Sequence, residues 1–112
     1  MDLPPYGTVL GRLSDLPDPG GREAGWEATP LFLVRKGSDV RCFVNICPHA
    51  GRALDWAPGR FLMDNGHLVC AAHGAVFTVP DGNCVSGPCR GQRLHEVPIE
   101  LRERVIYLTS ES

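Results

Sequence analysis

Turn-forming residues interrupt this chain so often that they leave room only for short secondary-structure elements. Glycine occurs 13 times and proline 10 times in 112 residues, and both are spread along the whole chain. Between them lie short runs rich in β-branched and aromatic residues, which are typical of strands. Long amphipathic helical patterns are missing. The sequence therefore predicts an all-β fold, a sandwich or barrel of eight or nine short strands.

Apolar runs locate the expected strands at residues 8–13, 31–36, 40–46, 60–63, 67–70, 75–79, 84–86, 94–101 and 105–108. Residues 15–25 are expected to form a loop and residues 53–57 a helical turn. The tail from Thr109 is expected to be frayed.

Turn signals join several of these runs into hairpins. They are Gly37-Ser38-Asp39, Asp64-Asn65-Gly66, Pro80-Asp81-Gly82-Asn83 and Arg102-Glu103-Arg104. In the run 40–46 the residues alternate, so Val40, Cys42, Val44 and Ile46 are expected to share one face of a strand.

The length suits a single domain over residues 1–112. Hydrophobic residues make up 43% and charged residues 21%, which allows one modest core, and the net charge of −2 does not indicate nucleic-acid binding. Residues 1–6 lack the basic and apolar regions of a secretory signal, and no apolar run approaches the roughly 20 residues of a membrane helix. We therefore expect a cytoplasmic protein that binds no membrane. Its five cysteines, an odd number, fit reduced thiols better than a disulfide framework.

Two short cysteine–histidine pairs carry the strongest chemical signal. They are CPH at residues 47–49 and CAAH at residues 70–73, separated by 20 residues. Each pair falls where an expected strand passes into a loop, with Gly51 or Gly74 close behind. Glycine lets the backbone approach a metal cluster closely and frees amides to point at sulfur. We therefore predict a metal site formed by Cys47, His49, Cys70 and His73.

The remaining cysteines and histidines are expected to be structural. Cys42 lies on an apolar strand face and should be buried. His67 and His95 lie beside ordinary strand and turn residues and should be at the surface. Cys84 and Cys89 should pack near a loop, and nothing in the sequence supports a disulfide between them.

Two kinds of metal centre can use two thiolates and two imidazoles. A tetrahedral zinc site is the first, but zinc spacing usually groups cysteine with cysteine and histidine with histidine. Here each loop mixes the two residue types. The mixture suits a two-iron cluster in which each loop gives one cysteine to one iron and one histidine to the other, as in a Rieske [2Fe–2S] centre.

The two motifs, CPH and CAAHG, resemble the Rieske signature, C-x-H followed after about twenty residues by C-x-x-H-G. The stretch that follows, HGAVFTVPDGNCVSGPCRGQRLHEVPI, is similar to that of Rieske-type ferredoxins. There a hairpin leads to a Gly-Pro turn, here Gly87-Pro88, and then to a strand that ends in Pro-Val or Pro-Ile, here Pro98-Ile99. The resemblance covers roughly residues 31–108.

The resemblance implies a stack of small antiparallel sheets in which two hairpin loops at one end hold one [2Fe–2S] cluster per subunit. The ligand loops would be about residues 47–53 and 70–75, with a third loop at about 86–90 covering the cluster. By the same resemblance, Cys47 and Cys70 would bind the inner iron, His49 and His73 would bind the outer iron near solvent, and Gly51, Gly74, Gly87 and Pro88 would shape the loops.

The sequence departs from the high-potential members of this family at four positions. Those proteins have two extra cysteines that bridge the ligand loops, where this chain has Arg52 and Ala72. They also have a serine and a tyrosine that donate hydrogen bonds to sulfur, where this chain has Ala75 and Phe77. Fewer donors stabilise the reduced cluster less, so we expect a potential of roughly −150 mV rather than +300 mV. The two imidazoles should also couple reduction to proton uptake.

The resemblance implies a one-electron carrier. The chain has no G-x-G-x-x-G dinucleotide motif, and only His67 and His95 would remain for the 2-His-1-carboxylate site of a non-haem iron oxygenase. We therefore expect a Rieske-type ferredoxin with no substrate-turnover site of its own. It would carry electrons from an NAD(P)H-dependent reductase to a terminal oxygenase of the ring-hydroxylating kind. Both partners would dock transiently at the histidine tip, which Arg52 and Trp56 would rim.

Two other functions fit parts of this pattern. One is a subunit fixed to a larger redox enzyme, such as the small subunit of assimilatory nitrite reductases, which resembles a Rieske domain. Those relatives commonly lack the cluster ligands, whereas all four are present here. The other is a structural zinc module that acts as an interaction domain.

Overall fold

The computed structural model describes residues 5–18, 20–24, 30–46, 62–64, 67–70, 74–79, 81–87 and 90–109. Within these ranges the chain forms eleven strands and one 3-10 turn. They are β1 (Val9–Arg12), η1 (Leu13–Asp15), β2 (Gly20–Glu23), β3 (Leu31–Lys36), β4 (Asp39–Val44), β5 (Leu62–Asp64), β6 (His67–Val69), β7 (Val76–Phe77), β8 (Cys84–Ser86), β9 (Glu96–Val97), β10 (Ile99–Arg102) and β11 (Val105–Leu108). None of the helices in the described ranges has the length and apolar character needed to cross a membrane.

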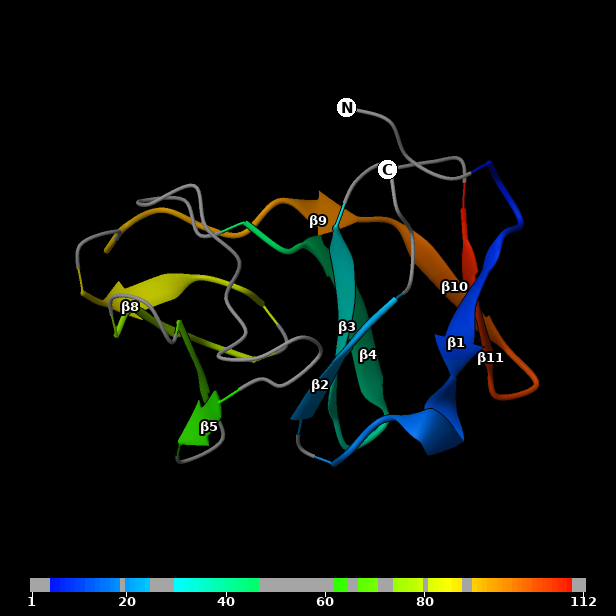
Figure 1. Ribbon diagram of the computed structural model, residues 1–112, viewed down its shortest axis with the longest axis horizontal. Helices are drawn as coiled ribbons and strands as arrows, with labels where there is room; N and C mark the ends of the chain where they lie inside the picture. The colour runs from blue at the N-terminus through cyan, green and yellow to red at the C-terminus, as the bar shows by residue number, and fades with distance from the viewer. Residues whose placement is uncertain are drawn as a thin grey trace.

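The strands form three small antiparallel sheets (Figure 1). The terminal sheet has the order β1-β11-β10, the central sheet β2-β3-β4-β9, and the loop sheet β5-β6-β7-β8. In Figure 1 the central sheet stands between the other two, with the loop sheet on the left. This arrangement confirms the predicted all-β fold of small antiparallel sheets.

The central sheet buries side chains on both of its faces. Residues 31–34, LFLV, are each exposed by 2% or less. Because side chains alternate along a strand, Leu31 and Leu33 point into one apolar cluster and Phe32 and Val34 into another. The continuous apolar run in the sequence therefore marks a strand in the middle layer of the molecule.

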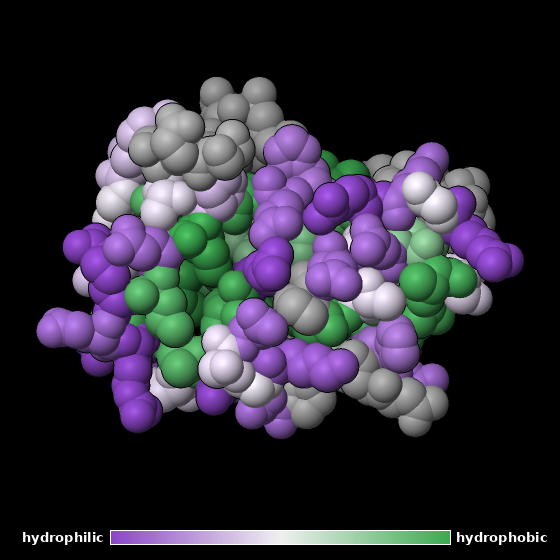
Figure 2. Space-filling model, turned by 180° about the vertical axis from the view of Figure 1, so that it is seen from behind, coloured by the Kyte–Doolittle hydropathy of each residue, from purple (hydrophilic) through white to green (hydrophobic). Residues whose placement is uncertain are grey.

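Each face of the central sheet packs against a different neighbouring sheet. The terminal core lies toward the terminal sheet and contains Leu10, Leu16, Leu31, Leu33, Cys42, Val44, Val97, Ile106 and Leu108. The loop core lies toward the loop sheet and contains Phe32, Val34, Phe43, Leu68, Cys70, Ala75, Phe77, Val79, Cys84 and Leu94. Seen from behind, the hydrophobic side chains that reach the surface form patches interrupted by hydrophilic ones (Figure 2).

The expected face of the strand at 40–46 is partly confirmed. Val40 packs against the terminal core, and Cys42 and Val44 belong to it. Ile46 does not share this face, because β4 ends at Val44 and the Ile46 side chain is 40% exposed. The Ile46 N–H donates to the Val44 carbonyl at 2.9 Å, so the chain turns sharply as it leaves the sheet.

The prediction of a loop over residues 15–25 was wrong, because this segment contains β2. The strand has the sequence GGRE, which offers no apolar alternation to recognise. It pairs along its whole length with β3, from Gly20 opposite Arg35 to Glu23 opposite Phe32, at the edge of the central sheet. Backbone hydrogen bonding to a strong neighbouring strand, and not side-chain burial, makes this segment a strand.

The expected strand at 94–101 is two strands, divided at Pro98. β9 pairs with β4 in the central sheet, whereas β10 pairs with β11 in the terminal sheet. Proline has no N–H to donate, so it breaks the ladder where the chain passes between sheets. The Pro98 carbonyl accepts a hydrogen bond from the Thr109 N–H at 3.1 Å, which holds the first residue after β11. The rest of the expected frayed tail and the helical turn expected at 53–57 lie outside the described residues.

Two hairpin turns contain residues with positive φ, but only one of them has glycine at that position. Between β3 and β4, Gly37 has φ of +64°, and glycine adopts this conformation without strain. Between β10 and β11, Glu103 and Arg104 have φ of +50° and +67°. Two successive positive φ values are typical of a type I′ turn, which favours Asn-Gly. Left-handed backbone costs a residue with a Cβ roughly 1–2 kcal/mol.

We predict that the double substitution Glu103→Asn, Arg104→Gly increases the free energy of unfolding by about 1 kcal/mol, because both new residues adopt positive φ more easily. Urea denaturation followed by circular dichroism measures the effect. Ser38→Gly is the control, since Ser38 has no positive φ to relieve and glycine there only loosens the unfolded chain. If the double variant is destabilised, as Ser38→Gly is expected to be, the expected relief of strain is contradicted.

Candidate metal centre

The second cysteine–histidine pair begins where β6 ends. The Cys70 side chain is fully buried in the loop core, with an exposed fraction of 0%. The Cys70 N–H donates to the Ala75 carbonyl at 2.7 Å, and the Gly74 N–H donates to the Cys70 carbonyl at 2.8 Å. These two hydrogen bonds close a tight loop between β6 and β7. The loop contains His73, which lies outside the described residues.

Gly74 completes this loop with φ of +72°. Glycine is favoured in that region because a Cβ would crowd the backbone. The position therefore favours glycine where the chain turns back from Cys70 into β7.

The predicted third loop packs directly on the predicted second ligand loop. Gly87 has φ of +98°, and a Cβ placed on it would lie 2.9 Å from the Ala75 Cα. Only a residue without a side chain allows the two backbones to approach this closely. Pro88, also predicted to shape this loop, lies outside the described residues. The structure thus brings together Gly87, Ala75 and Cys70.

The first pair follows β4, the neighbour of β3 in the central sheet. The Val44 N–H donates to the His95 carbonyl at 2.9 Å, and the N–H of the buried Asn45 donates to the Pro30 carbonyl at 2.8 Å. These contacts fix the backbone two residues before Cys47. Cys47, His49 and Gly51 themselves lie outside the described residues.

Both predicted ligand loops leave strands that pack on one core. β4 contributes Phe43 to the loop core and β6 contributes Leu68, so the same apolar core holds the ends of both strands. Cys70 offers a soft sulfur in apolar surroundings, and cysteine and histidine together are the donors that iron–sulfur and zinc centres take. The described residues thus fit a buried cysteine-ligated cluster. Among the residues that the structure describes, no group of three or more histidine, cysteine or acidic side chains could hold a metal ion.

Cys42 is a structural thiol, as expected. Its side chain is fully buried in the terminal core. Burial and, to a smaller extent, the negative charge of Glu96 together raise the pKa of the Cys42 thiol to about 12. A thiol that stays protonated is neither a metal ligand nor a nucleophile at neutral pH.

The remaining histidines and cysteines differ in how deeply they are buried. His95 is exposed and His67 is half-buried, while Cys84 is buried in the loop core at the start of β8. Cys89 lies outside the described residues.

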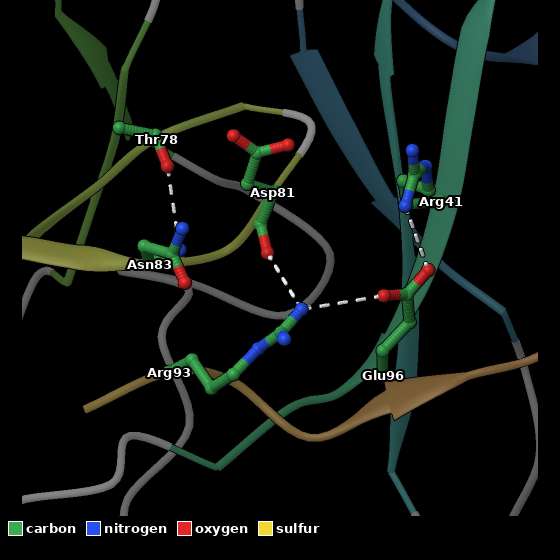
Figure 3. A network of polar contacts seen from close by, with 6 residues as sticks. All are labelled: Arg41, Thr78, Asp81, Asn83, Arg93 and Glu96. Atoms are coloured by element: carbon green, nitrogen blue, oxygen red, sulfur yellow. Dashed lines mark hydrogen bonds and ion pairs between the residues drawn. The ribbon is translucent and has the colours of Figure 1, made fainter.

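A polar network joins the central sheet to the turn that precedes β8 (Figure 3). Glu96 on β9 accepts from Arg41 on β4 at 3.1 Å and from Arg93 at 3.5 Å. Arg93 also donates to the Asp81 carbonyl at 3.3 Å. The side chains of this network are partly exposed, so its ion pairs contribute modestly to stability. It connects β9 of the central sheet to the turn at Asp81.

Comparison with protein families decides the nature of the centre. The model of the Rieske [2Fe–2S] domain matches residues 8–103, a range that includes both cysteine–histidine pairs. The chain belongs to the Rieske [2Fe–2S] domain family. Its cofactor is therefore a [2Fe–2S] cluster and not a zinc ion. A search of curated proteins found no match.

Solved structures share the Rieske fold over nearly the whole chain. The ferredoxin of carbazole 1,9a-dioxygenase from Nocardioides aromaticivorans IC177 is 20% identical, with a TM-score of 0.75, and covers 96% of this chain and 100% of its own. The Sphingomonas yanoikuyae B1 ferredoxin is 17% identical, with a TM-score of 0.76, and covers 94% and 99%. The terminal oxygenase of carbazole 1,9a-dioxygenase from Novosphingobium sp. KA1 is 14% identical, with a TM-score of 0.72, and covers 96% of this chain but 30% of its own. These likenesses establish the fold.

The raised pKa of Cys42 predicts a loss of stability at high pH. The folded thiol has a pKa of about 12, against 9.0 for an ordinary cysteine, so only the unfolded chain ionises between these values. The stabilising contribution is complete below about pH 9 and decreases as the pH rises toward 12, by up to roughly 1.4 kcal/mol per pH unit.

Urea denaturation at pH 7.5, 9 and 10 under reducing conditions tests this expectation. The Cys42→Val variant is the control, because it keeps an apolar side chain and removes the titrating group. The difference in free energy of unfolding between the two proteins should shift against the native protein as pH rises. A difference independent of pH would show that Cys42 ionises normally in the folded chain.

Proposed function

We propose that this protein is a one-electron carrier of the Rieske ferredoxin type, with its cluster held between residues 47–53 and 70–75. Cys47 and Cys70 would bind one iron, and His49 and His73 the other. The observation that carries this assignment is the fully buried Cys70 in a closed hairpin loop, with Gly87 packed against that loop from the third segment. When bound, the cluster accepts and releases a single electron.

Residues around the cluster would set its reduction potential. In the loop core, Ala75 and Phe77 are both fully buried and carry no hydroxyl group that could donate to sulfur. Each histidine ligand would keep a second ring nitrogen able to carry a proton. Because that proton is lost more easily from the oxidised centre, reduction should be accompanied by proton uptake at the two imidazoles.

The partners we propose are an NAD(P)H-dependent reductase and a terminal oxygenase. Two neighbours support the oxygenase partner: the ferredoxin of a carbazole 1,9a-dioxygenase, and a complex of reduced oxygenase and oxidised ferredoxin of that system, which is 24% identical over 93% of each chain with a TM-score of 0.73. Docking would take place at the histidine tip, with Arg52 and Trp56 at its rim. Ile46 and Val85, which adjoin the first and third loops, are 40% and 44% exposed and would add apolar contact. Small interfaces of this kind are weak and transient.

A fixed subunit of a larger redox enzyme, such as a nitrite reductase, is the second candidate. The extent of the structural matches supports the carrier, because this chain covers 99–100% of two ferredoxins and 30% of an oxygenase. The single-domain organisation over residues 1–112 and a cytoplasmic location complete the proposal.

Visible absorption and low-temperature EPR, before and after dithionite, test the cluster assignment. We expect a red-brown protein with a Rieske-type EPR signal after reduction. His49→Ala and His73→Ala should each abolish that signal, because the second iron loses a nitrogen ligand. The half-buried His67 provides the control, and His67→Ala should keep the full signal. Loss of the signal in His67→Ala but not in His73→Ala would overturn the ligand assignment.

A redox titration tests the effect of the missing hydroxyl donors. The native protein should have a reduction potential near the low end of the Rieske range, roughly −150 mV. Ala75→Ser should raise the potential, because a hydroxyl donated toward sulfur stabilises the more negative reduced cluster. Ala24→Ser makes the same chemical change against the terminal core and should leave the potential unchanged. A strongly positive potential in the native protein would refute this account.

A further inference from the structure

The approach of Gly87 to Ala75 depends on an irregularity in the loop sheet. β7 and β8 pair with Phe77 opposite Cys84 and Val76 opposite Ser86. One step along β7 therefore matches two steps along β8, and Val85 is the extra residue of a β-bulge. The Val85 side chain is 44% exposed, as expected for a residue outside the ladder.

The bulge decides which residue of the third loop faces the second ligand loop. Continuing the pairing by one residue brings Gly87 beside Ala75, in agreement with the 2.9 Å between the Ala75 Cα and a Cβ built on Gly87. Without the extra residue the ladder would place Ser86 there. Any side chain would push the loops apart, so the close approach requires both the bulge and the glycine.

Cys84 is the residue that ties this bulge together. Its buried thiol donates to the Ser86 carbonyl at 3.3 Å, which spans the bulge from one side to the other. Its N–H donates to the Gln92 carbonyl at 2.8 Å, and its carbonyl accepts from the Gly91 N–H at 3.2 Å. The two backbone hydrogen bonds close the base of the third loop, and the thiol bond sets the position of Ser86 above that base.

We propose that the Cys84 thiol holds the bulge at Val85 and so positions the third loop against the second ligand loop. Cys84 is a positioning residue that acts through Ser86 and Gly87. That these loops enclose the cluster rests on the function proposed above. The packing of Cys84 in the loop core and its hydrogen bond are separable, because valine fills the space without donating and serine donates without filling it.

The test compares Cys84→Ser with Cys84→Val in the cluster-containing protein. Amide hydrogen exchange of the segment 84–92, read by mass spectrometry, measures opening of the third loop. Loss of one hydrogen bond in Cys84→Val should speed exchange about five-fold, whereas Cys84→Ser should stay within about two-fold of the native rate. The g-values of the reduced protein should shift in Cys84→Val and be restored in Cys84→Ser.

Cys42 supplies a matched control, because it is a buried cysteine in the other core. Cys42→Ser and Cys42→Val should leave exchange of 84–92 and the g-values unchanged. If packing alone mattered, Cys84→Val would resemble the native protein more closely than Cys84→Ser, and this order would overturn the proposal. A native protein with no Rieske EPR signal would instead overturn the proposed function, and the exchange rates would still decide the role of Cys84.

Discussion

Burial of β3 and β4 on both faces is the constraint from which the rest of the molecule is built. Phe32 and Phe43 face the loop core with ring centroids 5.8 Å apart, while Leu33 and Cys42 face the terminal core. A sheet covered on both sides needs two partners, and the chain supplies them as the terminal and loop sheets. At the ~25 cal/mol per Å² gained on burying apolar surface, these contacts outweigh the partly exposed ion pairs at the edges.

The candidate metal centre depends on small residues and backbone hydrogen bonds more than on large side chains. Gly74 turns the chain back from Cys70, and Gly87 lets the third loop approach Ala75. Residues without bulk at these positions bring loops close to one another around a buried sulfur. Ala75 and Phe77, which are buried in the same core as Cys70, carry no hydroxyl group, and this connects the packing of that core with the proposed low potential.

Three buried cysteines among the described residues have different roles because their surroundings differ. Cys42 has a raised pKa through burial and through Glu96, which Arg41 and Arg93 hold in place. Cys70 begins a loop whose other residues belong to the predicted ligand motif. Cys84 lies across a β-bulge and donates to a carbonyl. Residue type alone does not separate these cases, whereas position in the sheets does.

The sequence by itself determined the strand-rich class, the hairpins at Gly37 and Glu103, and the two cysteine–histidine motifs, because turn residues and ligand spacing are local properties. It missed β2, since GGRE becomes a strand only through hydrogen bonds to β3. It also predicted one strand where the structure has two, β9 and β10. The chain passes from the central sheet to the terminal sheet at Pro98, and this depends on which strands lie beside each segment. Only the tertiary structure decided that Gly87 meets Ala75, because this contact follows from a one-residue bulge in the pairing of β7 with β8. Register between strands is a long-range property, and no local pattern in the sequence specifies it.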